Sequence, residues 1–139
     1  MQDSVQAPPN GSPFEAVEAF RVALSVGDGK GVEAAHTDGD VTILDNVAPF
    51  IWSGPAAVAT WLADMAAYAR HRGLSDQNVI YGAAISELID GDAAYGIYPA
   101  EWTYLEHGTP RRDKATIAFA LRYTPRGWKI AGWSWNPKP

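Results

Sequence analysis

Residues 93–136, AAYGIYPAEWTYLEHGTPRRDKATIAFALRYTPRGWKIAGWSWN, decide the fold class. Aromatic and β-branched residues are frequent in this stretch, which is typical of β-strands. The turn residues His107-Gly108 and Pro125-Arg126-Gly127 interrupt it twice. Because links this short join antiparallel neighbours, we expect a meander. Its predicted strands span 93–106, 113–124 and 127–136.

A fourth run of strand-forming residues, over about 78–89, precedes this meander. Asp90-Gly91 separates it from the next strand, and such a pair is a strong hairpin signal. Two shorter strands are expected over 41–44 and 50–52, around a turn. The rest of the N-terminal half has apolar residues at helical spacing. Helices followed by a meander predict the α+β class.

Three helices are predicted before the meander. Ser12-Pro13-Phe14-Glu15 is a capping box with proline at the first helical position, and Gly27 ends that helix. A short second helix is expected over about 30–36. The clearest helix opens at Gly54-Pro55 and stops at Gly73, with basic residues in its last turn.

Composition indicates one domain and narrows the range of partners. The chain has 139 residues, which suits a single domain over 12–139 after a polar tail, 1–11, that we expect to be disordered. A net charge of −5 argues against a nucleic-acid partner, because such partners need a basic face. The lack of cysteine excludes disulfides and thiolate zinc sites. No run approaches the roughly 20 apolar residues of a membrane span, so no membrane partner is expected; the sequence does not indicate the compartment.

The bulky aromatic residues gather on one side of each expected strand, because side chains alternate across a strand. Tyr98, Trp102 and Tyr104 share one parity, and Trp133 and Trp135 share one in the last strand. Three explanations stay open: a solid core, a cavity for an apolar ligand with tyrosine hydroxyls as polar handles, or an outward dimer interface. We expect a mixture, in which most rings fill the core and some line a cavity.

Three segments of the chain resemble the NTF2-like superfamily, which includes ketosteroid isomerases and SnoaL-like polyketide cyclases. The segments are 20–28 (FRVALSVGD), 41–54 (VTILDNVAPFIWSG) and 127–135 (GWKIAGWSW). The resemblance covers about residues 13–136. It implies a cone in which a curved mixed or antiparallel sheet packs on three N-terminal helices around a pocket.

The resemblance also bears on chemistry, through Asp45 at the end of the strand 41–44. Asp45 resembles the general base of the ketosteroid isomerases, and a carboxylate at the mouth of an apolar pocket has the raised pKa that suits this role. Phe20 and Phe119 stand where those isomerases place two oxyanion donors, each worth on the order of 10²–10³ in rate. The resemblance therefore disfavours that isomerase mechanism here. Asp45 followed by Asn46 is equally consistent with ordinary turn chemistry.

Two hypotheses for function follow. In the first, the chain binds an apolar or aromatic small molecule as a homodimer formed through the sheet. Any enzyme activity is then a cofactor-independent isomerase, cyclase, dehydratase or hydrolase step with Asp45 as acid or base, and Tyr98 or Tyr104 polarises the substrate. In the second, a non-catalytic domain with a filled interior makes a homodimer or binds a protein partner. The expected substrate-binding residues are Phe20, Trp52, Trp61, Met65, Tyr98, Trp102, Tyr104, Phe119, Trp133 and Trp135.

The sequence implies no cofactor and no metal site. Its three histidines, His36, His71 and His107, do not have metal-ligand spacing. His36 is followed closely by two aspartates in an expected loop, so we predict that it lies at the surface.

Overall fold

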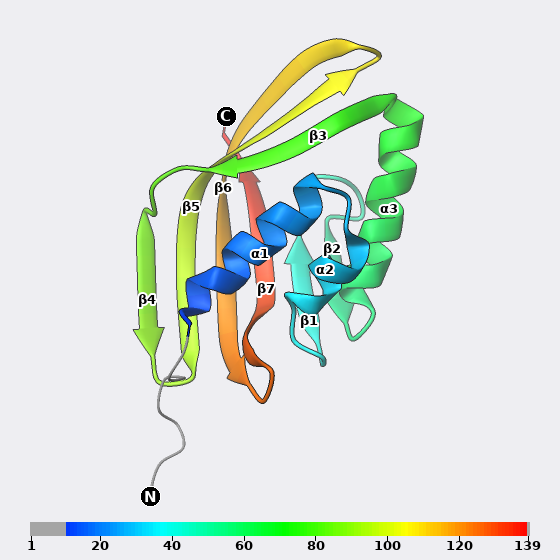
Figure 1. Cartoon of the computed structure of the whole chain (residues 1–139). Helices are drawn as coiled ribbons and strands as arrows, with labels where there is room; N and C mark the ends of the chain where they lie inside the picture. The colour runs from blue at the N-terminus through cyan, green and yellow to red at the C-terminus, as the bar shows by residue number, and fades with distance from the viewer. Residues whose placement is uncertain (1–10, 139) are drawn as a thin grey trace, which may run out of the picture.

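The computed structural model describes residues 11–138, in which helices come first and an antiparallel meander follows (Figure 1). The predicted tail, 1–11, lies outside the described residues except for Gly11. No helix within 11–138 combines the length and the hydropathy that a bilayer span requires. The helices are α1 (Pro13–Ser25), α2 (Gly29–Ala34) and α3 (Ala57–Arg72), and the strands are β1 (Val41–Leu44), β2 (Ile51–Gly54), β3 (Leu74–Tyr81), β4 (Ser86–Asp90), β5 (Ala93–Glu106), β6 (Thr109–Thr124) and β7 (Gly127–Pro137).

The strands form one curved, open sheet in the order β2-β1-β7-β6-β5-β3, with β4 also paired to β5. β1 runs parallel to β7, and the other pairings are antiparallel. α1 packs on β3, β6 and β7, and α3 packs on β1, β2 and β3, so the helices lie over the same side of the sheet (Figure 1). This confirms the α+β class and the curved sheet on three helices.

The run 78–89, predicted as one strand, is two strands. β3 starts before residue 78, directly after Gly73, whose left-handed backbone at φ 68° ends α3. The segment 82–85 contains a glycine and two alanines, which have little preference for a strand, and separates β3 from β4. β5 is long enough to pair with both, because its Ala100 faces the end of β3 and its Ile97 faces the start of β4.

The parallel contact between β1 and β7 fixes the position of β1, the strand that directly precedes Asp45. Thr42 faces Gly132 across this contact, and Ile43 faces Trp133. The approach is close at the glycine, because a Cβ atom on Gly132 would lie 2.9 Å from the carbonyl oxygen of Thr42. A larger residue at this position would therefore push β1 away from β7.

We predict that Gly132→Ala lowers the free energy of unfolding by roughly 1–3 kcal/mol, because the added methyl group meets backbone that cannot rotate away. Gly39→Ala is the matched control, since a Cβ at Gly39 meets no heavy atom within 4 Å. Urea unfolding followed by circular dichroism measures both variants. Equal stability of the two would contradict the close β1–β7 packing.

His36 lies in the core, so the prediction that it lies at the surface is wrong. Its side chain is 1% exposed, and its ring meets the Phe20 ring edge-to-face at 5.3 Å between centroids. Nδ1 is 2.7 Å from the carbonyl oxygen of Val32, and Nε2 accepts from Trp133 Nε1 at 3.2 Å. Both bonds fit the neutral ring with its proton on Nδ1. Burial lowers the pKa of His36 to about 4.

This buried histidine predicts a loss of stability in mild acid. Between the unfolded pKa of 6.5 and the folded pKa of about 4, the unfolded chain binds a proton at His36 that the folded chain does not. The free energy of unfolding therefore falls as pH falls through this window, by up to about 3 kcal/mol. Urea unfolding at a series of pH values measures it.

The comparison that isolates His36 is between two glutamine variants. In His36→Gln the part of the pH dependence that falls within this window should disappear, while His71→Gln, at an exposed position on α3, should keep it. If the two variants gave the same pH dependence as the original chain, His36 would not be the titrating group.

Candidate functional site

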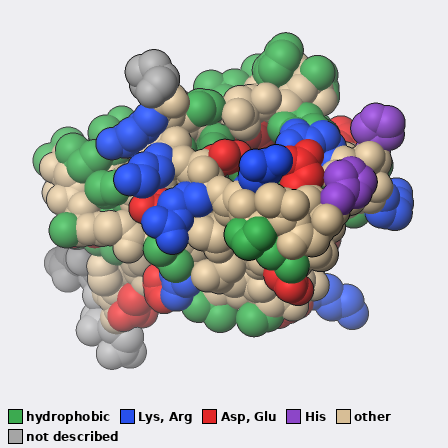
Figure 2. All heavy atoms as spheres, turned by 90° about the horizontal axis from the view of Figure 1, so that it is seen from above, with side chains coloured by type: hydrophobic (Ala, Val, Ile, Leu, Met, Phe, Trp, Pro, Cys, Tyr) green, Lys and Arg blue, Asp and Glu red, His purple; other side chains and the backbone are tan. Residues whose placement is uncertain are grey.

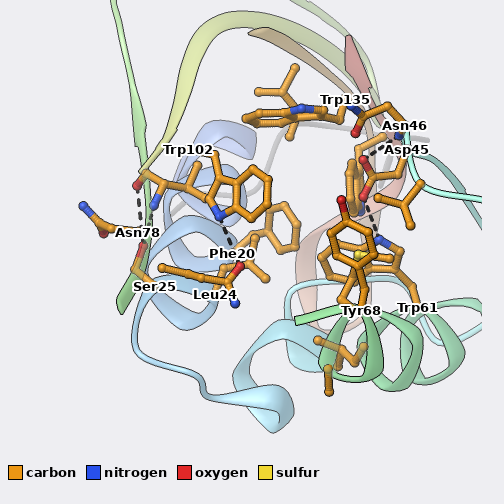
Figure 3. Close-up of a pocket in the computed structure, with 18 of the residues that line it drawn as sticks. Phe20, Leu24, Ser25, Asp45, Asn46, Trp61, Tyr68, Asn78, Trp102 and Trp135 are labelled. Atoms are coloured by element: carbon orange, nitrogen blue, oxygen red, sulfur yellow. Dashed lines mark hydrogen bonds between the residues drawn. The ribbon is translucent and has the colours of Figure 1, made fainter. Parts of the chain in front are cut away.

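A cavity of about 310 Å³ lies between the helices and the sheet, beside Asp45 (Figure 3). Its walls are mostly aromatic and aliphatic side chains from α1, α3, β3, β5, β6 and β7. A cavity of this size is at the lower end of the range that holds small-molecule ligands. The aromatic residues that line it are Phe20, Trp61, Tyr68, Tyr81, Trp102, Trp133 and Trp135.

Asp45 directly follows β1, at the start of the turn that leads to β2. Its backbone amide donates to the carbonyl oxygen of Phe50 at 3.2 Å, which closes the turn. The carboxylate accepts one hydrogen bond on each oxygen: Oδ2 from Trp61 Nε1 at 3.0 Å and Oδ1 from the Asn46 amide at 2.7 Å (Figure 3). A carboxylate has about four lone-pair sites, so two stay free for a ligand or a proton.

Burial raises the pKa of the half-buried Asp45 carboxyl above its ordinary value, and the hydrogen bonds from Trp61 and Asn46 partly oppose this. The cause is loss of water around the charged form. A carboxylate that is less well solvated than in water is a stronger base. The arrangement can therefore accept a proton from a molecule in the cavity.

The wall beside Asp45 is held by a series of contacts that ends in the core. The Trp61 ring meets the Trp133 ring edge-to-face at 4.9 Å between centroids and an interplanar angle of 87°. Trp133 in turn donates its indole N–H to His36. His36 thus fixes the orientation of a ring that lines the cavity, although it does not line the cavity itself. Sequence reasoning missed this contribution, because Trp133 is 97 residues away from His36 in the chain.

Six of the ten expected substrate-binding residues line the cavity together with Asp45. Trp61 and Met65 come from one face of α3, and Phe20 comes from α1. In Figure 3 Trp135 and Trp102 lie on the side of the cavity formed by the sheet, while Tyr68 lies with Trp61 and Asp45. The six residues are Phe20, Trp61, Met65, Trp102, Trp133 and Trp135.

The other four expected residues, Trp52, Tyr98, Tyr104 and Phe119, are not among the cavity-lining side chains. Trp52 donates its indole N–H to Asp64 at 2.8 Å. The hydroxyl of Tyr98 donates to Glu87 at 2.6 Å, and that of Tyr104 donates to Asp113 at 3.0 Å. Phe119 is 0% exposed and packs inside the core. The two tyrosine hydroxyls expected to polarise a substrate are thus bonded to carboxylates outside the cavity lining.

Two tyrosines that the sequence analysis did not select line the cavity instead. Tyr68 follows Trp61 and Met65 at the spacing of one helical face, and this signal could have found it. Tyr81 has the same parity as Val79 and Gln77 in β3, which also line the cavity. Its hydroxyl is buried and has no hydrogen-bond partner, and burial raises its pKa.

Charge in the cavity lining comes from Asp45. Among residues 11–138, the lining contains no lysine, arginine or histidine. The described part of the chain also has no group of three or more histidine, aspartate or glutamate side chains placed to hold a metal ion. The polar side chains that join Asp45 in the lining are those of Asn46, Ser25, Gln77, Asn78 and the two tyrosines.

No protein-family model matches the chain, and no curated protein matches it. Solved structures match its fold. An NTF2-like superfamily protein from Salmonella enterica serovar Typhimurium has a TM-score of 0.76 and 11% identity, covering 91% of this chain and 88% of that one. A ketosteroid isomerase-like protein from Erwinia carotovora atroseptica has a TM-score of 0.69 and 19% identity, covering 90% and 93%.

A third structure, an NTF2-like protein with a cystatin-like fold from Novosphingobium aromaticivorans, has a TM-score of 0.68 and 18% identity, covering 87% of this chain and 76% of that one. Identities this low carry the fold and not the chemistry, because function depends on particular side chains in the site. The order of elements, the curved open sheet and these structural matches together establish that the chain has the fold of the NTF2-like superfamily.

Proposed function

We propose that this protein binds a small apolar or aromatic molecule in the cavity and that Asp45 transfers a proton to or from it. The observation that carries the proposal is the position of Asp45, half-buried and hydrogen-bonded on both oxygens at the edge of an aromatic cavity of about 310 Å³. Turn chemistry alone explains the bond to Asn46. It does not explain a carboxylate that meets an indole N–H of α3 inside a hollow interior.

The cavity walls favour a ligand with a large apolar surface. Ring faces and aliphatic groups bind by excluding water, at about 25 cal/mol per Å² of apolar surface buried. Trp61 and Met65 present such surface from α3, and Trp135 presents it from β7. A flat or ring-containing molecule would be enclosed between the helix and the sheet.

The nature of the proton step is limited by what surrounds Asp45. Phe20 lies in the cavity wall and cannot donate a hydrogen bond, and Phe119 lies behind it in the core, 5.8 Å away between ring centroids. These two positions therefore give no support to an oxyanion, which would have to be held by another polar group of the lining, such as the unpartnered hydroxyl of Tyr81. A reaction needs fewer such donors when its developing charge is dispersed over the ligand or is carried away by a good leaving group. Isomerase, cyclase, dehydratase and hydrolase steps of this kind fit the site better than steps that form a localised oxyanion.

The alternative of a non-catalytic domain rests on a filled interior, and the space beside Asp45 does not favour it. Dimer formation through the sheet stays a prediction. It is compatible with either function, because the cavity lies on the side of the sheet that the helices cover.

Proton removal by Asp45 is testable without knowing the natural substrate. The probe 5-nitrobenzisoxazole is a small aromatic bicycle whose ring opens when a base removes one proton from carbon, and the charge released is dispersed over the nitrophenolate. We predict that the protein accelerates this reaction and that Asp45→Asn lowers the rate at least about 10²-fold. Absorbance of the nitrophenolate product measures the rate.

Asp64→Asn is the matched control for this experiment. Asp64 accepts an indole N–H from Trp52 as Asp45 does from Trp61, but it does not line the cavity. The control should keep the rate of the original chain. Equal rates in the two variants would remove Asp45 from the proposed chemistry.

The pH dependence of the same reaction reports the state of Asp45. Because only the deprotonated carboxylate accepts a proton, we predict that kcat/KM rises with pH and levels off, with a midpoint above the ordinary carboxyl pKa of 3.8. In Trp61→Phe the midpoint should move to still higher pH, because the bond from Trp61 lowers the pKa of Asp45. A midpoint at or below the ordinary value would contradict the effect of burial.

A further inference from the structure

The cavity combines aromatic walls with one kind of charge. Four tryptophans, two tyrosines and one phenylalanine line it, and Asp45 supplies a carboxylate. No lysine, arginine or histidine of the described chain belongs to the lining. Two arginines contact lining residues from outside, since Arg72 lies over the Tyr68 ring and Arg21 donates to the carbonyl oxygen of Val79. Each of them is paired with a glutamate, Arg72 with Glu106 and Arg21 with Glu18. The charge within the described lining that is not paired with an opposite charge is therefore the negative charge of Asp45. The whole chain has a net charge of −5. On the face seen in Figure 2, basic and acidic side chains are interspersed, so the negative charge is not gathered into one patch there.

The indole N–H groups, which are the positive edges of the tryptophan rings, are largely occupied by protein acceptors. Trp61 donates to Asp45, Trp102 donates to Gln77 at 3.1 Å, and Trp133 donates to His36. These groups are not available to bind a carbonyl or an anion in the cavity. What the rings offer a ligand is mainly their electron-rich π surface, which attracts cations.

The rings and the carboxylate face the same space. In Figure 3 Trp135 lies across one side of the cavity, Trp102 lies along another, and Trp61 and Tyr68 lie with Asp45 opposite Trp102. One face of Trp102 is covered by Tyr104, with 4.0 Å between ring centroids, which holds the indole in place. A positive group of the ligand can therefore contact Asp45 while the rest of the ligand stays between the rings.

We propose that the ligand of this cavity is a hydrophobic organic cation, an amine or quaternary ammonium compound whose charged nitrogen lies against Asp45 and whose apolar part lies among the tryptophans. This rests on the proposed ligand-binding function and names its ligand class. The cation compensates the carboxylate for the water it has lost, and the indole rings add cation–π attraction. A neutral ligand of the same shape obtains neither contribution.

Two probes of nearly the same shape isolate the charge. Phenyltrimethylammonium and tert-butylbenzene differ in a nitrogen that replaces a carbon and brings a positive charge, and the ammonium can neither give nor take a proton. Quenching of tryptophan fluorescence measures both affinities. We expect the cation to bind at least about tenfold more tightly, a difference equivalent to about 1.4 kcal/mol, and benzenesulfonate to bind more weakly than either.

The variants assign this preference to the site. Asp45→Asn should remove most of the preference for the cation, whereas Asp64→Asn should keep it, because Asp64 has a similar indole partner outside the cavity. Trp135→Leu tests the aromatic contribution separately, since Trp135 is only partly buried and its replacement leaves Asp45 unchanged. It should weaken binding of the cation more than binding of tert-butylbenzene.

Equal affinities for the cation and its neutral isostere would overturn the proposed ligand class. If tert-butylbenzene still bound and Asp45 still opened nitrobenzisoxazole, the proposed function would stand with a neutral ligand. If neither probe bound but the protein still opened the ring of nitrobenzisoxazole, the proposal of a cationic ligand would be overturned. The proposal that Asp45 is a general base would stand. A cation preference unchanged in Asp45→Asn would place the binding elsewhere and overturn the inference.

Discussion

The hydrogen bond from Trp61 to Asp45 joins the helix α3 to the residue that directly follows the strand β1. α3 provides the donor, and the residue after β1 provides the acceptor, 3.0 Å away. This bond lies in the cavity wall. Trp61 also packs on Trp133, and Trp133 donates a hydrogen bond to His36 in the core. Side chains from four separate segments of the chain thus depend on one another in a single line of contacts.

This line of contacts has a cost in stability that a purely structural core would avoid. Asp45 is held where its charged form is poorly solvated, and His36 is held where its charged form is excluded. Replacing either by an apolar side chain of similar size would remove this desolvation penalty, but it would leave the indole N–H of Trp61 or Trp133 without its acceptor. Such residues persist in proteins where the site needs them, which agrees with a functional role for the cavity.

The sequence predicted the elements well, because each is determined by local signals. The capping serine of α1 accepts from the Phe14 amide at 3.2 Å, and Gly73 ends α3 as its position indicated. Asp45 could also be placed, since it directly follows a clear β-branched run. The run 78–89 was predicted as one strand because the break at 82–85 carries no strong turn signal, and the long strand β5 pairs with both of the shorter strands end to end.

The composition of the cavity wall was harder to predict. Parity tells which face of a strand a residue occupies, but not which end of a long strand lies beneath the helices. Tyr98 and Tyr104 have the same parity as Trp102, yet their hydroxyls bind Glu87 and Asp113 at other points along the sheet. His36 could not be placed for a related reason, because its partner Trp133 is 97 residues away in the chain.

The division of one long edge into β3 and β4 has a further consequence. An exposed sheet edge can pair with another chain and start aggregation, and the risk grows with the length of uninterrupted edge. β3 carries a register shift between Ser75 and Asn78, and β4 is five residues long, with Leu88 and Ile89 exposed on it. Because the segment 82–85 interrupts the edge, these apolar residues do not lie on one continuous strand with which another chain could pair. Short and irregular edge strands of this kind are the arrangement by which β-rich proteins limit pairing between exposed sheet edges.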